Sequence, residues 1–297
     1  MRIKDPGIEQ ASQATSGTNR CAITILTVIA VLLFAQTSAQ AQRSSVPNST
    51  YYAGFAEYYQ ADYRDAEKIF SRASNGALQA GGQRFLDSVC YMTMLGECHF
   101  QVGNYSQAVE LYEQALALYL DYVAADWQSR VRVPPAITED TGAIQKANIT
   151  WGNPQRKFII PSMPDTMSYQ FGEAGGVERA IVQGGVAREA ELRPIDVTEI
   201  MRCAAIALHR RRFIKGETCK YDPFSIRLQD GLTSYAGGNG TLLGAFNGVL
   251  FGIAQASTGK YDSAQKRLVS SLQFNGSMDH PLTAIALLEL ALSLIHI

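Results

Sequence analysis

The sequences GFAEYYQADYRDAEKIFSRA, at residues 54–73, and GECHFQVGNYSQAVELYEQA, at residues 96–115, decide the fold of this chain. The two stretches align without a gap, and the same kinds of residue recur at the same positions. In the first stretch these residues are Gly54, Tyr58, Ala61, Tyr63, Ala66, Phe70 and Ala73. In the second they are Gly96, Phe100, Gly103, Tyr105, Ala108, Tyr112 and Ala115. Self-similarity of this kind predicts a structural unit that occurs more than once along the chain.

The recurring residue types fit a pair of antiparallel helices joined by a short turn. Small residues let two helices approach closely, and they occupy the first position and the later alanine positions of both stretches. Ala61 and Gly103 fall where the first helix should end, and glycine there tolerates the left-handed conformation. The tyrosine that follows fills the turn, and the large residues Phe70 and Tyr112 fill the space beside the neighbouring pair.

A third copy, GIAQASTGKYDSAQKRLVSS, runs over residues 252–271. It keeps four of the small and aromatic positions and replaces the last two with Leu268 and Ser271. The retained residues are Gly252, Gly259, Tyr261 and Ala264. We therefore expect a third helical pair in this region.

The pattern of the three copies resembles the tetratricopeptide repeat (TPR) family. The resemblance implies a mainly α fold, in which helical hairpins stack into an α-α superhelix. It also implies that the first helices of the pairs line a concave groove that binds a protein or peptide. On this interpretation the repeat-packing residues are the matched positions quoted above.

The spacing between copies divides the chain into regions. Ala66 and Ala108 are about 42 residues apart, against about 34 in a regular TPR array, so a longer connection is expected near residues 75–82. Repeats 1 and 2 occupy residues 42–128. Residues 129–195 lose the helical period and carry several prolines and glycines, which predicts an irregular, partly β insertion.

Helical periodicity returns after residue 195. Asp196 and Glu199 have the spacing of a capping box at a helix start, and Asp222-Pro223 predicts a second start. Residues 196–291 are therefore expected to hold a divergent helical repeat, repeat 3 and the start of a further helix.

The N-terminus has the pattern of a secretory signal. A basic, polar segment precedes the apolar run at residues 21–35, and Ala39 and Ala41 supply a small-residue cleavage site. We expect residues 1–41 to be a signal peptide cleaved after Ala41, which places a bacterial-type protein in the periplasm or cell envelope. The alternative is an uncleaved membrane anchor. Membrane contact is expected only through this segment.

The last residues, LSLIHI at 292–297, match what the mosaic end of a transposase used in sequencing libraries encodes in one frame. We interpret them as adapter sequence. The intact protein is then expected to continue beyond residue 291, where it could hold a further domain.

The sequence offers no catalytic, cofactor or metal site. The net charge of −1 argues against a nucleic-acid partner, and signatures such as G-x-S-x-G, H-E-x-x-H and C-x-x-C do not occur. Cys90, Cys98 and His99 do not form a closed set of zinc ligands. The basic run at residues 209–212 is interpreted as charge that opposes the dipole at a helix C-terminus. Pairing of the cysteines that follow the signal segment is left open.

The TPR resemblance implies which residues could face a partner. The candidates are Tyr51, Phe55, Tyr59, Glu97, Gln101 and Ile253. The Lys and Asn residues of the carboxylate-clamp subfamily are absent, so that specific role is rejected. The aromatic candidates could form a hot spot for a peptide, or could pack against the N-terminal segment or the insertion.

Three functions fit these observations. The first is an exported TPR scaffold that binds a protein partner and is not an enzyme. The second is a regulatory TPR region whose catalytic domain lies beyond the C-terminus. The third is an insertion at residues 129–195 that folds as a small module for a glycan or peptide.

Overall fold

The structure is a computed structural model that describes residues 46–80, 83–132, 144–145, 157–159, 168–171, 191–235, 241–273 and 278–295. The expected signal peptide at residues 1–41 and much of the expected insertion lie outside these ranges. Of the segment interpreted as adapter sequence, residues 292–295 are described.

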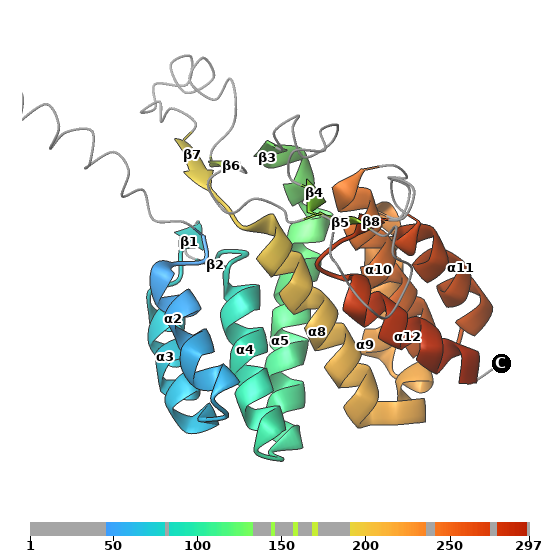
Figure 1. Cartoon of the computed structure of the whole chain (residues 1–297), viewed down its shortest axis with the longest axis horizontal. Helices are drawn as coiled ribbons and strands as arrows, with labels where there is room; N and C mark the ends of the chain where they lie inside the picture. Colours follow the sequence, from blue (N-terminus) through green and yellow to red (C-terminus); the bar gives the residue numbers. More distant parts are fainter. Residues whose placement is uncertain are drawn as a thin grey trace, which may run out of the picture. The chain divides into compact units, whose positions relative to one another are not determined.

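Paired helices follow one another along the described chain (Figure 1). The pairs are α2 (Ser49–Tyr59) with α3 (Tyr63–Asn75), α4 (Ser88–Gln101) with α5 (Tyr105–Ala124), α8 (Val197–Lys215) with α9 (Pro223–Leu232), and α10 (Leu242–Ser257) with α11 (Tyr261–Leu272). A further helix, α12 (Thr283–Ile295), packs mainly against α11. Short 3-10 helices are η1 (Trp127–Arg130), η3 (Gly216–Tyr221) and η4 (Thr233–Tyr235). The predicted mainly α, TPR-like α-α superhelical fold is confirmed.

Short strands occupy the connections. The longer link between the first two pairs contains an antiparallel hairpin of β1 (Gln79–Ala80) and β2 (Gln83–Arg84). Between α5 and α8, β6 (Ser168–Phe171) pairs antiparallel with both β3 (Val131–Arg132) and β7 (Glu191–Pro194). A second sheet joins β4 (Ile144–Gln145), β5 (Lys157–Ile159) and β8 (Met278–Asp279), with β5 and β8 parallel. The expected β content of the middle region is therefore present.

The small residues of the repeats lie where two helices touch. A Cβ atom on Gly54 would be 2.6 Å from the ring of Phe70, and one on Gly96 would be 2.6 Å from the ring of Tyr112. In the third copy, a Cβ atom on Gly252 would be 2.8 Å from the Leu268 side chain. The alanines of the second helices are fully buried, namely Ala66, Ala73, Ala108, Ala115 and Ala264. In these three pairs the glycine of the first helix thus packs against the large residue of the second helix.

The turns between paired helices share one backbone feature. Ala61, Gly103 and Gly259 all have positive φ, of 64°, 80° and 78°. Each is followed shortly by the tyrosine that begins the second helix, namely Tyr63, Tyr105 and Tyr261. In these three pairs a residue with positive φ follows the first helix, where the chain reverses.

Two helix starts after residue 195 form as the sequence predicts. The Asp196 side chain accepts a hydrogen bond from the backbone N–H of Glu199, and Asp222 accepts one from the N–H of Ser225. Only half of the capping box is made at the first start, because the N–H of Asp196 donates to the Val46 carbonyl. The Glu199 carboxylate instead accepts a hydrogen bond from the hydroxyl of Tyr51.

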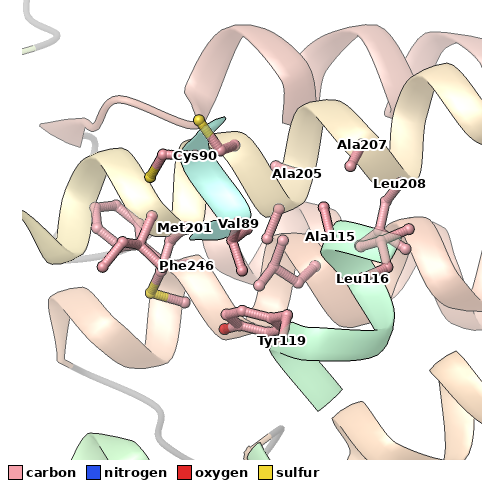
Figure 2. Packing of buried hydrophobic residues seen from close by; sticks show 14 of the residues in the cluster. Val89, Cys90, Ala115, Leu116, Tyr119, Met201, Ala205, Ala207, Leu208 and Phe246 are labelled. Atoms are coloured by element: carbon pink, nitrogen blue, oxygen red, sulfur yellow. The ribbon is translucent and has the colours of Figure 1, made fainter. Parts of the chain in front are cut away.

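One hydrophobic core runs through the pairs. Figure 2 shows its centre, where α4, α5, α8 and α10 contribute buried side chains. The labelled residues are Val89, Cys90, Ala115, Leu116, Tyr119, Met201, Ala205, Ala207, Leu208 and Phe246. Helix α8 lies against both α4 and α5 on one side and α10 on the other, so it joins the first two pairs to the later helices. None of the helices in the described ranges is both long and apolar enough to cross a membrane.

Candidate partner-binding surface

Helices α2, α4 and α8, the first helices of three consecutive pairs, carry a surface made of two groups of touching aromatic and arginine side chains. We call it the aromatic–arginine surface, and it consists of Phe55, Tyr58, Tyr59, Phe100, Arg202, Arg210 and Phe213.

The α2 end of this surface is a stacked aromatic pair. The rings of Phe55 and Tyr59 lie 5.8 Å apart at 30°, and the Arg202 guanidinium lies 5.6 Å from the centre of the Phe55 ring. Phe55 is half-buried, whereas Tyr59 is 77% exposed. This end offers a rigid aromatic face to solvent, because Phe55 is also held edge-on by Phe70.

The α8 end is a second aromatic group. The Arg210 guanidinium lies 4.1 Å from the centre of the Phe100 ring, and Phe213 packs edge-on against the same ring at 5.9 Å. Phe213 is 63% exposed. Covering such an exposed apolar side chain with a partner removes apolar surface from water, which makes the free energy of binding more favourable.

The buried Glu97 links the two ends of the surface, because it bonds to Tyr58 at one end and Arg210 at the other. Its carboxylate accepts hydrogen bonds from Tyr58 at 3.1 Å and Tyr112 at 2.6 Å, and pairs with both Nε and Nη2 of Arg210. Burial, together with the Glu97 charge, raises the pKa of Tyr58 and Tyr112 above the usual range. Both tyrosines are therefore neutral donors near pH 7, and the buried carboxylate is fully paired.

The basic run at residues 209–212 connects α8 to four other helices. Arg210 pairs with Glu97 on α4, and Arg211 pairs with Glu113 on α5 and Asp222 before α9. His209 and Arg212 both reach Glu289 on α12, at 2.7 Å each. The run therefore forms specific ion pairs between helices, a role beyond the expected one of opposing the helix dipole.

The ion pair with Arg211 lowers the pKa of Asp222. Burial alone would raise the pKa of this carboxyl, but hydrogen bonds from Arg211, the Ser225 N–H and Lys215 lower it to about 2. Asp222 is thus ionised throughout the neutral range. It caps α9 and holds the end of α8 with the same side chain.

The six predicted partner-facing residues fall into two groups. Phe55, Tyr59 and Gln101 are at least partly exposed, and the Gln101 amide donates to the Tyr58 hydroxyl at 3.3 Å. Tyr51, Glu97 and Ile253 are buried, which corrects the expectation that they face a partner. Tyr51 donates to Glu199, Glu97 is enclosed by the network above, and Ile253 lies in the core of α10.

Five residues of the surface were not predicted from the sequence: Tyr58, Phe100, Arg202, Arg210 and Phe213. Tyr58 and Phe100 are the aromatic residues that recur in the first two copies, so the repeat alignment could have pointed to them. The three α8 residues lie on one helix face at intervals of three to four residues or multiples of these. They carry no repeat signature, because this pair departs from the pattern.

Other sites expected or excluded from the sequence can be placed briefly. Cys90, Cys98, Cys203 and Cys219 are all buried, and each is a free thiol. Within the described ranges, no cluster of three His, Cys, Asp or Glu side chains could hold a metal ion.

Comparison with known proteins identifies the first two helical pairs. Residues 46–121 match the family model described as tetratricopeptide repeat. No curated protein and no solved structure matches the chain. The match spans the first two copies quoted from the sequence, including Gly54, Gly96 and the residues they contact. The first two helical pairs, over residues 46–121, therefore carry a TPR-type repeat.

Proposed function

We propose that this protein is a non-enzymatic scaffold that binds a protein partner through the aromatic–arginine surface. The observation that carries the proposal is the pair of exposed aromatic groups, at Tyr59 and Phe213, held on helices that the core fixes in place. Aromatic and arginine side chains dominate the hot spots of protein interfaces. TPR repeats in general mediate protein–protein interaction.

The charges of the surface indicate what the partner should present. Arg202 pairs with Glu199 through two hydrogen bonds of 2.7 Å, and Arg210 pairs with Glu97. Because both cations are already paired with carboxylates, they offer little net charge, and each guanidinium lies over an aromatic ring. The preferred partner is a peptide segment with aromatic or aliphatic anchors, and its binding should depend only weakly on salt.

We also propose that the protein is exported, although the scaffold role does not require export. The signal-like pattern at residues 1–41 suggests a place in the periplasm or cell envelope, and we propose that the partner is met there.

A selection experiment tests the proposal. Peptides are selected from a displayed random library on the immobilised protein, and their affinities are measured by fluorescence anisotropy. The double variant Phe55→Ala/Tyr59→Ala should weaken binding at least about tenfold, as expected of hot-spot residues. The matched control is Tyr221→Ala on η3, where the side chain is 78% exposed but lies outside the surface. Equal affinities of the double variant and the wild type would refute the proposal.

A further inference from the structure

A small pocket lies where the C-terminal ends of α8 and α10 meet η3, α11 and α12. Its volume is about 150 Å³, and its walls include His209, Arg212, Phe213, Lys220 and Ser257. Phe213 also belongs to the aromatic–arginine surface, so the pocket adjoins that surface. The other four side chains are not part of it.

His209 lines this pocket, and only one of its two ring nitrogens is bonded to a described residue. The residue is only 8% exposed, and its Nδ1 lies 2.7 Å from Oε1 of Glu289. Nothing in the described part of the chain bonds to its Nε2. The buried Glu289 carboxylate fixes the ring orientation, because it accepts a hydrogen bond from Nδ1–H.

Arg212 lines the same pocket, and part of its guanidinium is unpaired within the described ranges. Its Nη1 donates to Oε2 of Glu289 at 2.7 Å, whereas Nε and Nη2 have no hydrogen-bond acceptor among the described residues. The Arg212 side chain is only 11% exposed. Two parallel N–H groups on one edge of a guanidinium match the two oxygens of a carboxylate.

The rest of the pocket supplies a polar rim and an apolar wall. The Lys220 ammonium pairs with Glu217 at 3.0 Å. The Ser257 hydroxyl donates to the Ile253 carbonyl at 2.9 Å and keeps acceptor capacity. Phe213 supplies an apolar face. The charged and titratable groups that face His209 are Arg212 on its own helix, Glu217 and Lys220 on η3, Tyr261 on α11 and Glu289 on α12.

We propose that this pocket binds a small organic carboxylate, whose two oxygens accept hydrogen bonds from Nε and Nη2 of Arg212 and whose apolar part lies against Phe213. The single planar fork favours a carboxylate over a phosphate, since a second negative charge would meet Glu217 and Glu289. The pocket volume limits the enclosed part to a few heavy atoms. This inference does not depend on peptide binding to the aromatic–arginine surface.

The full chain is titrated with n-butyrate, with neutral butyramide as the matched control, while the imidazole signals of His209 are followed by NMR. Butyrate should shift the His209 signals saturably and leave those of His99 unchanged, and butyramide should have no such effect. Absence of a His209 shift, or equal shifts with both compounds, would overturn the proposal. Tighter binding of inorganic phosphate than of butyrate would also overturn it.

Because carboxylates occur both in free acids and at peptide ends, a tripeptide with a free or amidated C-terminus is titrated as well. If the free-acid tripeptide binds more tightly than butyrate and the amidated tripeptide does not bind, the carboxylate chemistry is supported and its source is assigned to a chain end. The variant Arg212→Lys keeps a positive charge beside Glu289 but lacks the planar fork. It should weaken butyrate binding at least about tenfold, while its circular dichroism stays that of the wild type. Unchanged affinity in a folded Arg212→Lys protein would contradict the assigned contact.

Discussion

Gly96 lies so close to Tyr112 that its position has no room for a side chain. A Cβ atom there would be 2.6 Å from the Tyr112 ring, whose hydroxyl is fixed by Glu97. We expect Gly96→Ala to lower the free energy of unfolding by about 1–3 kcal/mol, the usual cost of overpacking. Urea unfolding followed by circular dichroism measures this. The control is Gly76→Ala, where the new Cβ atom would be 3.4 Å from its nearest neighbour. Equal effects of the two substitutions would show that the close contact is not decisive.

Among the turns of the three repeat copies, the turn at Ala61 is the one in which a residue other than glycine has positive φ. Its φ of 64° costs an L-amino acid about 1–2 kcal/mol relative to glycine. Glycine also loses more backbone entropy on folding. Ala61→Gly should therefore raise the free energy of unfolding by about 0.5–1 kcal/mol. The reverse exchange, Gly103→Ala at φ 80°, should lower it. Thermal unfolding of both variants decides the matter, and a loss of stability in Ala61→Gly would contradict this explanation of the turn.

Asp87 makes the stability of the second pair depend on pH. Burial raises the pKa of this carboxyl to about 6, although the Leu78 N–H and the Tyr91 hydroxyl donate to it. In the unfolded chain the pKa is about 3.9. The folded state therefore binds the proton more tightly, and this contribution to stability is present below pH 4 and is lost as the pH rises through 6. By pH 7 the loss is about 3 kcal/mol.

The substitution Asp87→Asn tests this pH dependence, because the amide cannot ionise. Relative to the wild type, the variant should gain up to about 3 kcal/mol between pH 4 and pH 7. Urea unfolding at a series of pH values gives the difference directly. Asp121→Asn, in an exposed ion pair, serves as the control and should leave the slope unchanged. A constant difference between Asp87→Asn and wild type across this range would contradict the prediction.

At the level of single residues, the sequence predicted packing better than exposure. The small residues at positions 54, 96 and 252 indicated a close helix approach, because only a missing side chain allows it. Whether Tyr51 and Ile253 are exposed or buried could not be predicted in this way. It depends on which neighbouring helix covers a residue, and that neighbour, α8 in the case of Tyr51, lies far along the sequence.

Helix α8 is the element that joins the early and late parts of the described chain. Arg210 pairs with Glu97 of α4, and Glu97 is only 4% exposed. Arg210→Met should lower the free energy of unfolding by about 3 kcal/mol, because it leaves a buried carboxylate without its cation. The second variant, Glu97→Gln/Arg210→Met, removes the charge as well and should recover part of that loss. Lys68→Met, in an exposed pair with Asp65, should change stability by no more than about 0.5 kcal/mol.

The double-mutant cycle also has an outcome that would contradict the role of α8. If Arg210→Met and Lys68→Met cost the same, the basic run contributes no more than a surface charge. If the effects of Arg210→Met and Glu97→Gln on the free energy of unfolding were additive in the double variant, Arg210 and Glu97 would not be energetically coupled.

The starts of α8 and α9 could be predicted from local sequence signals, whereas the helices that they contact could not. Asp196 and Asp222 cap the two helices because an aspartate side chain can accept a hydrogen bond from a free N–H of the first turn. Which helix each arginine of the basic run reaches depends on tertiary packing. The directions of residues 209–212 around a helix differ by about 100° per residue, so consecutive residues necessarily face different neighbours.

At the scale of the whole molecule, repeat similarity predicted the α-α array, and long-range pairing escaped prediction. The parallel contact of β5 with β8 joins Lys157 to Met278. Such a contact leaves no periodic trace in either segment. The aromatic–arginine surface is likewise a property of three helices together, and only its α2 part, Phe55 and Tyr59, followed from the repeats.

The most direct test of the account locates a bound peptide on the folded protein. A photoreactive phenylalanine analogue replaces Tyr59, Phe213 or Tyr221 in separate preparations, and each is irradiated with a peptide selected for binding. Crosslinks to the peptide are expected from positions 59 and 213, and none from position 221. Crosslinking from position 221 alone, with positions 59 and 213 silent, would contradict the claim that α2, α4 and α8 present the partner-binding surface.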